Sequence, residues 1–175
     1  DPLLDADINI AGSLNIIELS RQFKVKKFIF SSTGGAIYSD GVKLPTPETV
    51  LPRPESPYGI AKFTIEQYLN FYCKYRGLNS VSLRYANVYG PRQDPKGEAG
   101  VVAIFAQKLL RGEVLTINGN GKQTRDYVFV SDVVNANLQA MKRGKVVGEI
   151  NIGTGKQTSV NELGKTLVRV ARLKS

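Results

Sequence analysis

Apolar residues recur along the chain in two patterns, one typical of helices and one typical of buried strands. Apolar side chains at helical spacing and a capping box predict helices over 5–22, 57–76, 101–110 and 131–143, and a last helix from 159 onward. Short apolar runs predict strands or extended segments over 26–32, 81–85, 114–117, 127–130 and 149–152. Because helices and strands alternate, the pattern predicts an α/β fold with a mostly parallel sheet.

Glycine, proline and capping residues set the expected boundaries. Five of the eight prolines lie in 40–57, which is therefore predicted to be a loop. Gly77 is a stop signal for the helix over 57–76. The segment 118–121 (Asn-Gly-Asn-Gly) predicts a tight turn, and Ser159 with Glu162 forms a capping-box pattern.

The ends of the predicted parallel strands are the expected place for a ligand. In open sheets of this kind, ligands bind beyond the carboxyl ends of the strands. Three polar segments fall there, namely 31–33, 85–87 and 151–153.

Composition excludes several classes of site. The chain has 175 residues, of which 42% are hydrophobic, with no stretch long enough to span a membrane and no visible signal peptide. Its single cysteine, Cys73, rules out an internal disulfide and fits a cytoplasmic protein. The absence of histidine removes serine–histidine triads and histidine-ligated zinc, and we expect no metal site.

The net charge of +9 leaves three interpretations. It can reflect a solvated basic surface, an anionic small ligand such as a nucleotide diphosphate, or nucleic acid. Because the basic residues are spread out with no run of five, we do not expect a nucleic-acid partner.

Tyr58 and Lys62 form a Tyr-x-x-x-Lys pair at the start of a predicted helix, where a spacing of four places both on one face. A free tyrosine has a pKa near ~10 and is a poor base at neutral pH. A neighbouring ammonium and the positive end of a helix favour the phenolate. The plain alternative is a helix with an exposed lysine and a half-buried tyrosine.

A hydroxyl-rich strand end precedes this pair. Ser31, Ser32 and Thr33 close a predicted strand, and Gly34 and Gly35 then allow the backbone to approach a ligand closely. A simple turn would show the same residues, but the tyrosine–lysine pair downstream favours a catalytic site.

The segments FIFSSTGGAIY, SPYGIAK, LRYANVYGPRQ, TRDYVFVSDVV and NIGTG, in this order, resemble the extended short-chain dehydrogenase/reductases. Within these, the chain is most similar to the UDP-glucose 4-epimerases. The resemblance implies a Rossmann-like doubly wound parallel sheet with its first strands absent, and a small α+β substrate-binding region. Residues 1–90 would be the carboxyl-terminal half of the NAD-binding core, and 91–175 mainly the substrate region, with some segments returning to the core sheet.

The resemblance also implies catalytic and cofactor-binding roles. Tyr58 would be the base for the sugar 4-hydroxyl, while Lys62 would hold the nicotinamide ribose and lower the pKa of Tyr58. Thr33 would hydrogen-bond the reacting oxygen, with Ser32 as the second candidate. Asn9 and Ala86 match positions near NAD.

The implied substrate is a UDP-hexose. Asn87 and Arg125 match residues that bind the diphosphate, and a guanidinium suits phosphate oxygens. A salt bridge between Arg125 and Asp126 is the alternative for that arginine. The uridine site would be formed by Val101, Thr116, Ile117 and Asn118.

The resemblance therefore implies NAD-dependent epimerisation at C4, and other activities of the superfamily are the alternatives. Dehydratases and decarboxylases typically carry an acidic residue just after the strand hydroxyl, and the segment 33–38 has none. Ser39 replaces a glycine that the family often has there. A non-catalytic sugar-nucleotide-binding remnant is a further alternative.

Family members often form homodimers through two helices, which here would be 7–22 and the helix carrying Tyr58. Tyr68, Leu69 and Tyr72 are candidates for the apolar contact face, and packing on the sheet is the alternative for these side chains.

The family places a glycine-rich dinucleotide turn roughly a hundred residues before the catalytic tyrosine. No such turn precedes residue 34, and Gly153-Thr-Gly155 follows the wrong strand. We therefore expect a chain truncated at its amino end and also at its carboxyl end. We expect it not to bind NAD tightly by itself, because a helix amino end facing the pyrophosphate is a large part of such a site.

Overall fold

The structure, a computed structural model, describes residues 1–39, 41–96 and 100–172 and divides into two compact units. Unit 1 comprises residues 1–85 and 134–152, and unit 2 comprises 86–133 and 153–175. Each unit is therefore built from two separate segments of the chain.

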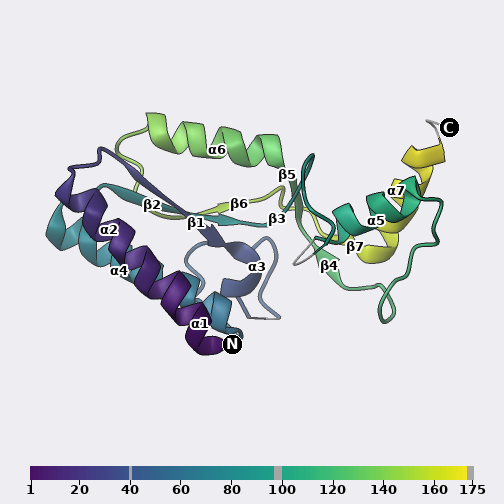
Figure 1. Cartoon of the computed structure of the whole chain (residues 1–175), viewed down its shortest axis with the longest axis horizontal. Helices are drawn as coiled ribbons and strands as arrows, with labels where there is room; N and C mark the ends of the chain where they lie inside the picture. The colour runs from purple at the N-terminus through teal and green to yellow at the C-terminus, as the bar shows by residue number, and fades with distance from the viewer. Residues whose placement is uncertain (40, 97–99, 173–175) are drawn as a thin grey trace. The chain divides into compact units, whose positions relative to one another are not determined.

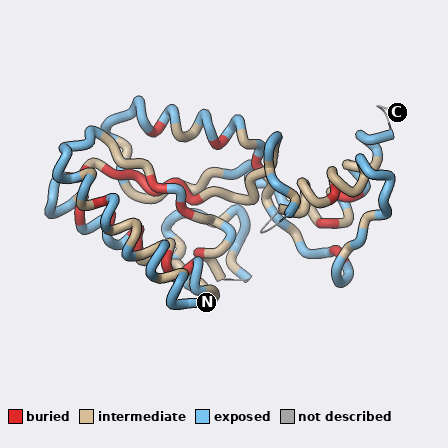
Figure 2. Tube along the Cα trace, viewed as in Figure 1, coloured by how far each residue is buried: buried red, intermediate tan, exposed pale blue. Residues whose placement is uncertain are grey.

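Unit 1 contains a parallel sheet with the strand order β1-β2-β6. The strands are β1 (Phe28–Thr33), β2 (Ser80–Tyr85) and β6 (Gly148–Ile152). Buried residues follow one another along the central strand β2, as Figure 2 shows. The predicted parallel sheet is thus confirmed, with β1 beginning at Phe28 rather than at the two lysines before it.

The register of this sheet aligns residues in rows across all three strands. Ser32, Arg84 and Asn151 form one row, and Thr33, Tyr85 and Ile152 form the next. The three polar segments expected at the strand ends therefore meet at the same edge.

Helices cover both faces of the unit 1 sheet (Figure 1). One face carries α1 (Pro2–Ala6), the π-helical turn η1 (Asp7–Ala11), α2 (Gly12–Gln22) and α4 (Pro57–Arg76). The other face carries α6 (Val130–Lys142). The short helix α3 (Gly34–Ile37) follows β1 directly.

The core between α4 and the sheet is a cluster of apolar side chains. Its buried members are Ile17, Phe30, Ile65, Leu69, Tyr72 and Leu78. Of the three side chains considered for a dimer face, Leu69 and Tyr72 thus lie inside unit 1, whereas Tyr68 is exposed. For Leu69 and Tyr72 the contact-face interpretation was therefore wrong, because helical periodicity turns these positions toward the sheet.

Helix α4 has the predicted bounds, and local signals explain both ends. Ser56 accepts a hydrogen bond from the amide of Gly59, and Pro57 occupies the first turn, where its missing N–H costs nothing. Gly77 ends the helix in the left-handed conformation with φ 70°.

The first helical segment starts earlier than predicted. The Asp1 carboxylate accepts hydrogen bonds from the amides of Leu3 and Leu4, so helix begins at Pro2 rather than near residue 5. It continues to Gln22 through the wide turn η1, where the Gly12 amide donates to the Asp7 carbonyl. Such turns are rare and are often found at functional sites.

The described residues of unit 2 include two small strand pairs and two helices. Strand β3 (Asn87–Tyr89) pairs in parallel with β5 (Tyr127–Phe129), and β4 (Thr124–Arg125) pairs antiparallel with β7 (Thr158–Ser159). The helices are α5 (Val101–Leu110) and α7 (Val160–Arg172). The predicted capping box is confirmed, since Glu162 accepts from the Ser159 amide and its own amide donates to the Ser159 hydroxyl.

Two sequence predictions in unit 2 differ from the structure. Residues 114–117 form no strand; instead Leu115 and Ile117 approach the buried Gly164 of α7. Apolar residues alternate there because they face a helix. An extended segment packed on a helix shows the same alternating sequence pattern as a strand. Val130, predicted as extended, is the first residue of α6.

No helix among the described residues is both long enough and apolar enough to cross a membrane.

Gly59 permits a close approach between α4 and the preceding segment of unit 1. A Cβ atom at this position would lie 2.3 Å from the carbonyl oxygen of Ala36 and 3.0 Å from the Cβ of Pro54. Since α4 carries Tyr58 in the same turn, the absence of a side chain at residue 59 sets where that turn can lie.

We predict that Gly59→Ala lowers the free energy of unfolding by about 2 kcal/mol, because the added methyl group must displace backbone atoms. Urea titration of the purified protein would measure the change. Gly144→Ala is the matched control, since a Cβ there meets no atom within 4 Å, and it should stay within about 0.5 kcal/mol of the parent. Equal effects of the two substitutions would contradict the prediction.

Candidate active site

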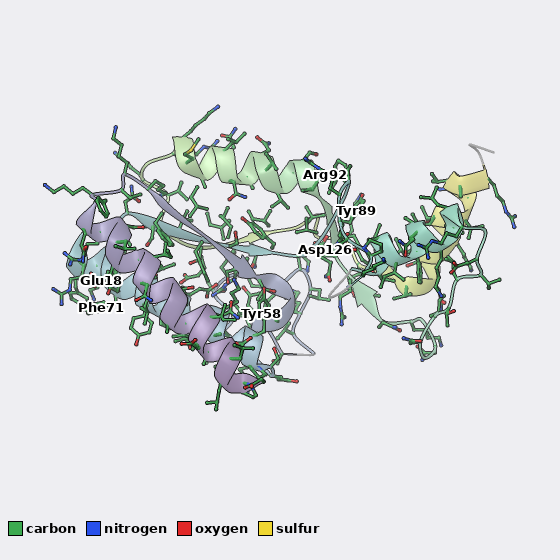
Figure 3. All side chains as sticks on the ribbon, in the orientation of Figure 1. Glu18, Tyr58, Phe71, Tyr89, Arg92 and Asp126 are labelled. Carbon is green, nitrogen blue, oxygen red and sulfur yellow. The ribbon has the colours of Figure 1, made fainter. Side chains whose placement is uncertain are left out.

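Tyr58 and Lys62 lie on one face of the first two turns of α4, and Figure 3 labels Tyr58 at the amino end of that helix. The Nζ atom of Lys62 lies 5.5 Å from the centre of the Tyr58 ring and 4.9 Å from that of Phe30. The same atom donates a hydrogen bond of 3.1 Å to the carbonyl oxygen of Ser31. The structure therefore brings the predicted lysine to both the predicted tyrosine and the end of β1.

Burial lowers the pKa of the Lys62 ammonium, and the negative charge of Asp5 opposes part of this shift. Tyr58 is 43% exposed, so its ring can be reached from solvent. A partly buried cation next to an accessible phenol suits proton transfer to a bound molecule.

The two hydroxyl candidates at the end of β1 have different surroundings. Ser32 is buried, and its Oγ donates a hydrogen bond of 2.6 Å to Oε1 of Glu66. Thr33 is half-buried and is the last residue of the strand. Because neighbouring side chains in a strand point to opposite faces, Ser32 shares the α4 face with Phe30. Thr33 lies one residue further on, where the strand ends and α3 begins.

Asn9 lies in the π-helical turn η1, and its Nδ2 donates a hydrogen bond of 3.2 Å to Asp5. Asp5 is also the carboxylate whose charge acts on Lys62. The predicted cofactor residue Asn9 thus belongs to the same polar neighbourhood as the lysine.

A buried ion pair beneath this region was missed by the sequence prediction. Arg84 donates from Nη2 to Oε2 of Glu66 at 2.6 Å and from Nε to Oε1 at 2.9 Å. Both side chains are almost fully buried, at 3% and 0% exposure respectively. One sequence signal was available, because Glu66 follows Lys62 by four residues and so continues the face that carries Tyr58.

In unit 2, the predicted diphosphate residues lie on paired strands. Asn87 begins β3, and its amide donates to the carbonyl oxygen of Asp126 at 2.9 Å. Arg125 is exposed, and its Nη1 donates to the carbonyl oxygen of Thr124 at 2.9 Å. Ala86 lies close to Gly153, where an added Cβ would be 3.2 Å from the alanine Cβ.

The carboxylate of Asp126, labelled in Figure 3, is occupied by the loop after β6. It accepts hydrogen bonds from the amide and the hydroxyl of Thr154, at 2.9 and 2.6 Å, and from the amide of Gly155 at 2.8 Å. The described structure shows no ion pair between Asp126 and Arg125. The salt-bridge alternative for Arg125 is therefore not observed.

The predicted uridine-site residues lie at the start of α5 and in the segment that follows that helix. Val101 is the first residue of α5, and the Thr116 hydroxyl accepts from Nζ of Lys108 at 3.1 Å. The Asn118 carbonyl accepts from Gln123 at 3.4 Å. Ile117 lines a surface cavity of about 500 Å³ beside α7. All four residues thus belong to unit 2.

Comparison with known proteins gives close matches over nearly the whole chain. A putative UDP-glucose 4-epimerase of Methanocaldococcus jannaschii is 48% identical over 163 residues, which cover 93% of this chain and 53% of that protein. The UDP-glucose 4-epimerase of Thermotoga maritima, solved with UDP-glucose, matches with a TM-score of 0.94 and 56% identity over all of this chain and 57% of that one. The Thermus thermophilus UDP-glucose 4-epimerase complex with NAD has a TM-score of 0.88 and 44% identity, covering 98% of this chain and 57% of that one.

These matches confirm the Rossmann-like α/β fold and the resemblance to UDP-glucose 4-epimerases. The chain spans about half the length of the curated relatives it matches. The family profile of NAD dependent epimerases and dehydratases matches residues 1–153. The chain therefore belongs to the NAD dependent epimerase/dehydratase family.

Proposed function

We propose that the gene product containing this chain is an NAD-dependent 4-epimerase that interconverts UDP-glucose and UDP-galactose. The observation that carries this proposal is the contact of Lys62 with both the Tyr58 ring and the end of β1. Relatives that bear the name UDP-glucose 4-epimerase, at 44–56% identity, support the choice of reaction.

The residues of unit 1 fit a nicotinamide cofactor. An ammonium has three donors, and the hydrogen bond from Lys62 to Ser31 uses one of them, so ribose hydroxyls can accept the others. Asn9, Thr33, Tyr58 and Lys62 would hold this cofactor. When bound, NAD supplies reversible acceptance and return of hydride at the sugar C4.

Proton transfer is assigned to Tyr58. Its phenolate, stabilised by the Lys62 cation, accepts the proton of the 4-hydroxyl as the sugar is oxidised, and returns it when the sugar is reduced on the opposite face. The Thr33 hydroxyl donates a hydrogen bond to the same sugar oxygen and fixes its position.

Sugar-nucleotide binding is assigned to unit 2. Since Asp126 is held by the loop 153–155, the exposed guanidinium of Arg125 remains available for diphosphate oxygens. Asn87 would contact the same group. The uridine would bind to the remaining predicted positions, which are Val101, Thr116, Ile117 and Asn118.

Two alternative functions have less support. A dehydratase or decarboxylase would need an acidic residue after the strand hydroxyl, and residues 33–38 contain none. A non-catalytic sugar-nucleotide-binding remnant would give no reason for the partly buried Lys62 ammonium to bond to the end of β1 beside an accessible tyrosine.

We also propose a cytoplasmic location. Cys73 is a free thiol, which persists in a reducing compartment.

We predict that Tyr58→Phe lowers kcat for conversion of UDP-galactose to UDP-glucose by at least about 10²-fold, because the proton acceptor is removed. A coupled assay of UDP-glucose formation measures this, and circular dichroism checks that the fold is kept. Tyr75→Phe removes an exposed hydroxyl from the last turn of the same helix and should leave kcat unchanged. Wild-type turnover by Tyr58→Phe would exclude the mechanism.

We further predict that Thr33→Val lowers kcat by about 10²-fold, because a donor to the reacting oxygen is lost. Ser32→Ala should cost less than about tenfold, since it removes a hydrogen bond to Glu66 and not one to the sugar. Steady-state kinetics on both variants gives the ranking, and the reverse order would assign the role to Ser32.

We propose that the protein forms a homodimer through the exposed faces of the first helical segment and α4. Ile8, Ile16 and Leu19 are exposed on the first, and Ile60, Tyr68 and Phe71 on the second. The two helices lie side by side on one face of the sheet (Figure 1). Exposed apolar side chains gathered on two neighbouring helices favour an interaction surface.

Phe71→Asp should therefore convert the dimer to monomers, because a charge cannot be buried in an apolar contact without large cost. Sedimentation velocity at micromolar concentration would measure the shift. Leu110→Asp, which changes an exposed apolar residue in unit 2, should leave the dimer intact. A parent protein that sediments as a monomer would disprove this proposal.

A further inference from the structure

A continuous polar network runs across unit 1 one residue before the strand ends. The row Ser32–Arg84–Asn151 takes one residue from each strand of the sheet. Glu66 of α4 joins two members of this row, since it accepts the Ser32 hydroxyl on Oε1 and receives Arg84 on both oxygens.

Tyr38 closes the network on the side of the proline-rich loop. Its hydroxyl accepts from Nη1 of Arg84 at 2.7 Å and donates to Oδ1 of Asn151 at 3.1 Å. The Nδ2 of Asn151 then donates to the Thr46 carbonyl, and its backbone amide donates to Glu48. The helix, all three strands and the loop are thereby joined by directional bonds.

Helix α4 contacts β1 through two polar side chains that lie one helical turn apart. Tyr58, Lys62 and Glu66 follow one another at intervals of four and share a face. Lys62 bonds to the carbonyl of Ser31, and Glu66, one turn later, bonds to the hydroxyl of Ser32. Two successive turns thus hold two successive strand residues, which fixes both the rotation of the helix and its position along the strand.

A contribution to folding stability does not by itself explain why the Glu66–Arg84 ion pair is buried. Burial by itself would lower the pKa of the Arg84 guanidinium, but its hydrogen bonds and charge interactions with Glu66 and Tyr38 outweigh burial and raise it. Replacing a buried ion pair by apolar residues of similar volume is often neutral or stabilising. Apolar side chains, however, do not specify the direction of a contact as hydrogen bonds do.

We propose that Glu66, through Arg84 and Ser32, is a positioning residue that sets the rotation of α4 so that Tyr58 and Lys62 face the end of β1. The consequence for catalysis rests on the proposed function, whereas the geometric role does not. The proposal assigns to the ion pair an effect on turnover that is separate from its effect on folding.

The test compares the gene product with the double variant Glu66→Met/Arg84→Met, which removes both charges and keeps the volume. Glu66→Gln alone would leave Arg84 buried without its counter-charge and is expected to unfold more readily. We expect the double variant to keep the thermal midpoint of the parent, while kcat falls about 10- to 100-fold and KM for UDP-galactose changes less than about twofold. Glu149→Gln removes a carboxylate charge that binds Asn70 of α4 at 2.8 Å and serves as the matched control with unchanged kcat.

A second measurement does not depend on turnover. Lysines are labelled at fixed pH with an amine-reactive reagent, and the rate at each site is read by mass spectrometry. The labelling rate of Lys62 should rise about threefold or more in the double variant, because a rotated helix withdraws the amine from the Ser31 carbonyl. Lys27, which bonds to Asn79 and the Val146 carbonyl near the amino end of β1, should keep its rate.

Each outcome decides the proposal. An unchanged Lys62 rate overturns it whatever happens to kcat, and a raised rate with parental kcat overturns the positioning role. If the parent does not epimerise UDP-galactose and the Lys62 labelling rate still rises in the double variant, the geometric role is supported and the proposed function is rejected. A raised rate together with lower kcat and unchanged stability supports both.

Discussion

The geometry of unit 1 depends on a charge buried near the end of the central strand of its sheet. Arg84 lies in the central strand, between apolar clusters on either face, so its guanidinium must find acceptors in fixed directions. Glu66 and Tyr38 are those acceptors, and they come from α4 and from the residue that follows α3. The apolar core brings α4 to the sheet, and the ion pair determines which face of the helix turns toward the strand end.

Much of the fold could be predicted from sequence, because the relevant signals are local. Pro57 and Gly77 mark the ends of α4, and the capping box of Ser159 and Glu162 marks the start of α7. The unbroken apolar run at 28–30 predicted the strand β1. The spacing of Tyr58 and Lys62 likewise predicted their contact, since residues four apart on a helix are neighbours in any fold.

Features that depend on distant parts of the chain could not be predicted. Glu66 and Arg84 are brought together only by the register of β1 and β2 and the position of α4. The segment 114–117 alternates like a strand, but its apolar residues face α7. Arg125 and Asp126 are adjacent in sequence and of opposite charge, yet Asp126 binds the loop at 154–155. Adjacency suggested a salt bridge, and tertiary structure supplied a different partner.

The wide turn at Asp7–Ala11 has a consequence for how sequences of related proteins are aligned. A π-turn holds one residue more than the corresponding α-helical turn, and each residue rotates a helix by about 100°. A relative with a regular helix at this place would be one residue shorter between Pro2 and Gln22. An alignment without a gap there would assign every residue before Asp7 to the wrong side of the helix. Asp5, which accepts a hydrogen bond from Asn9, is one of these residues.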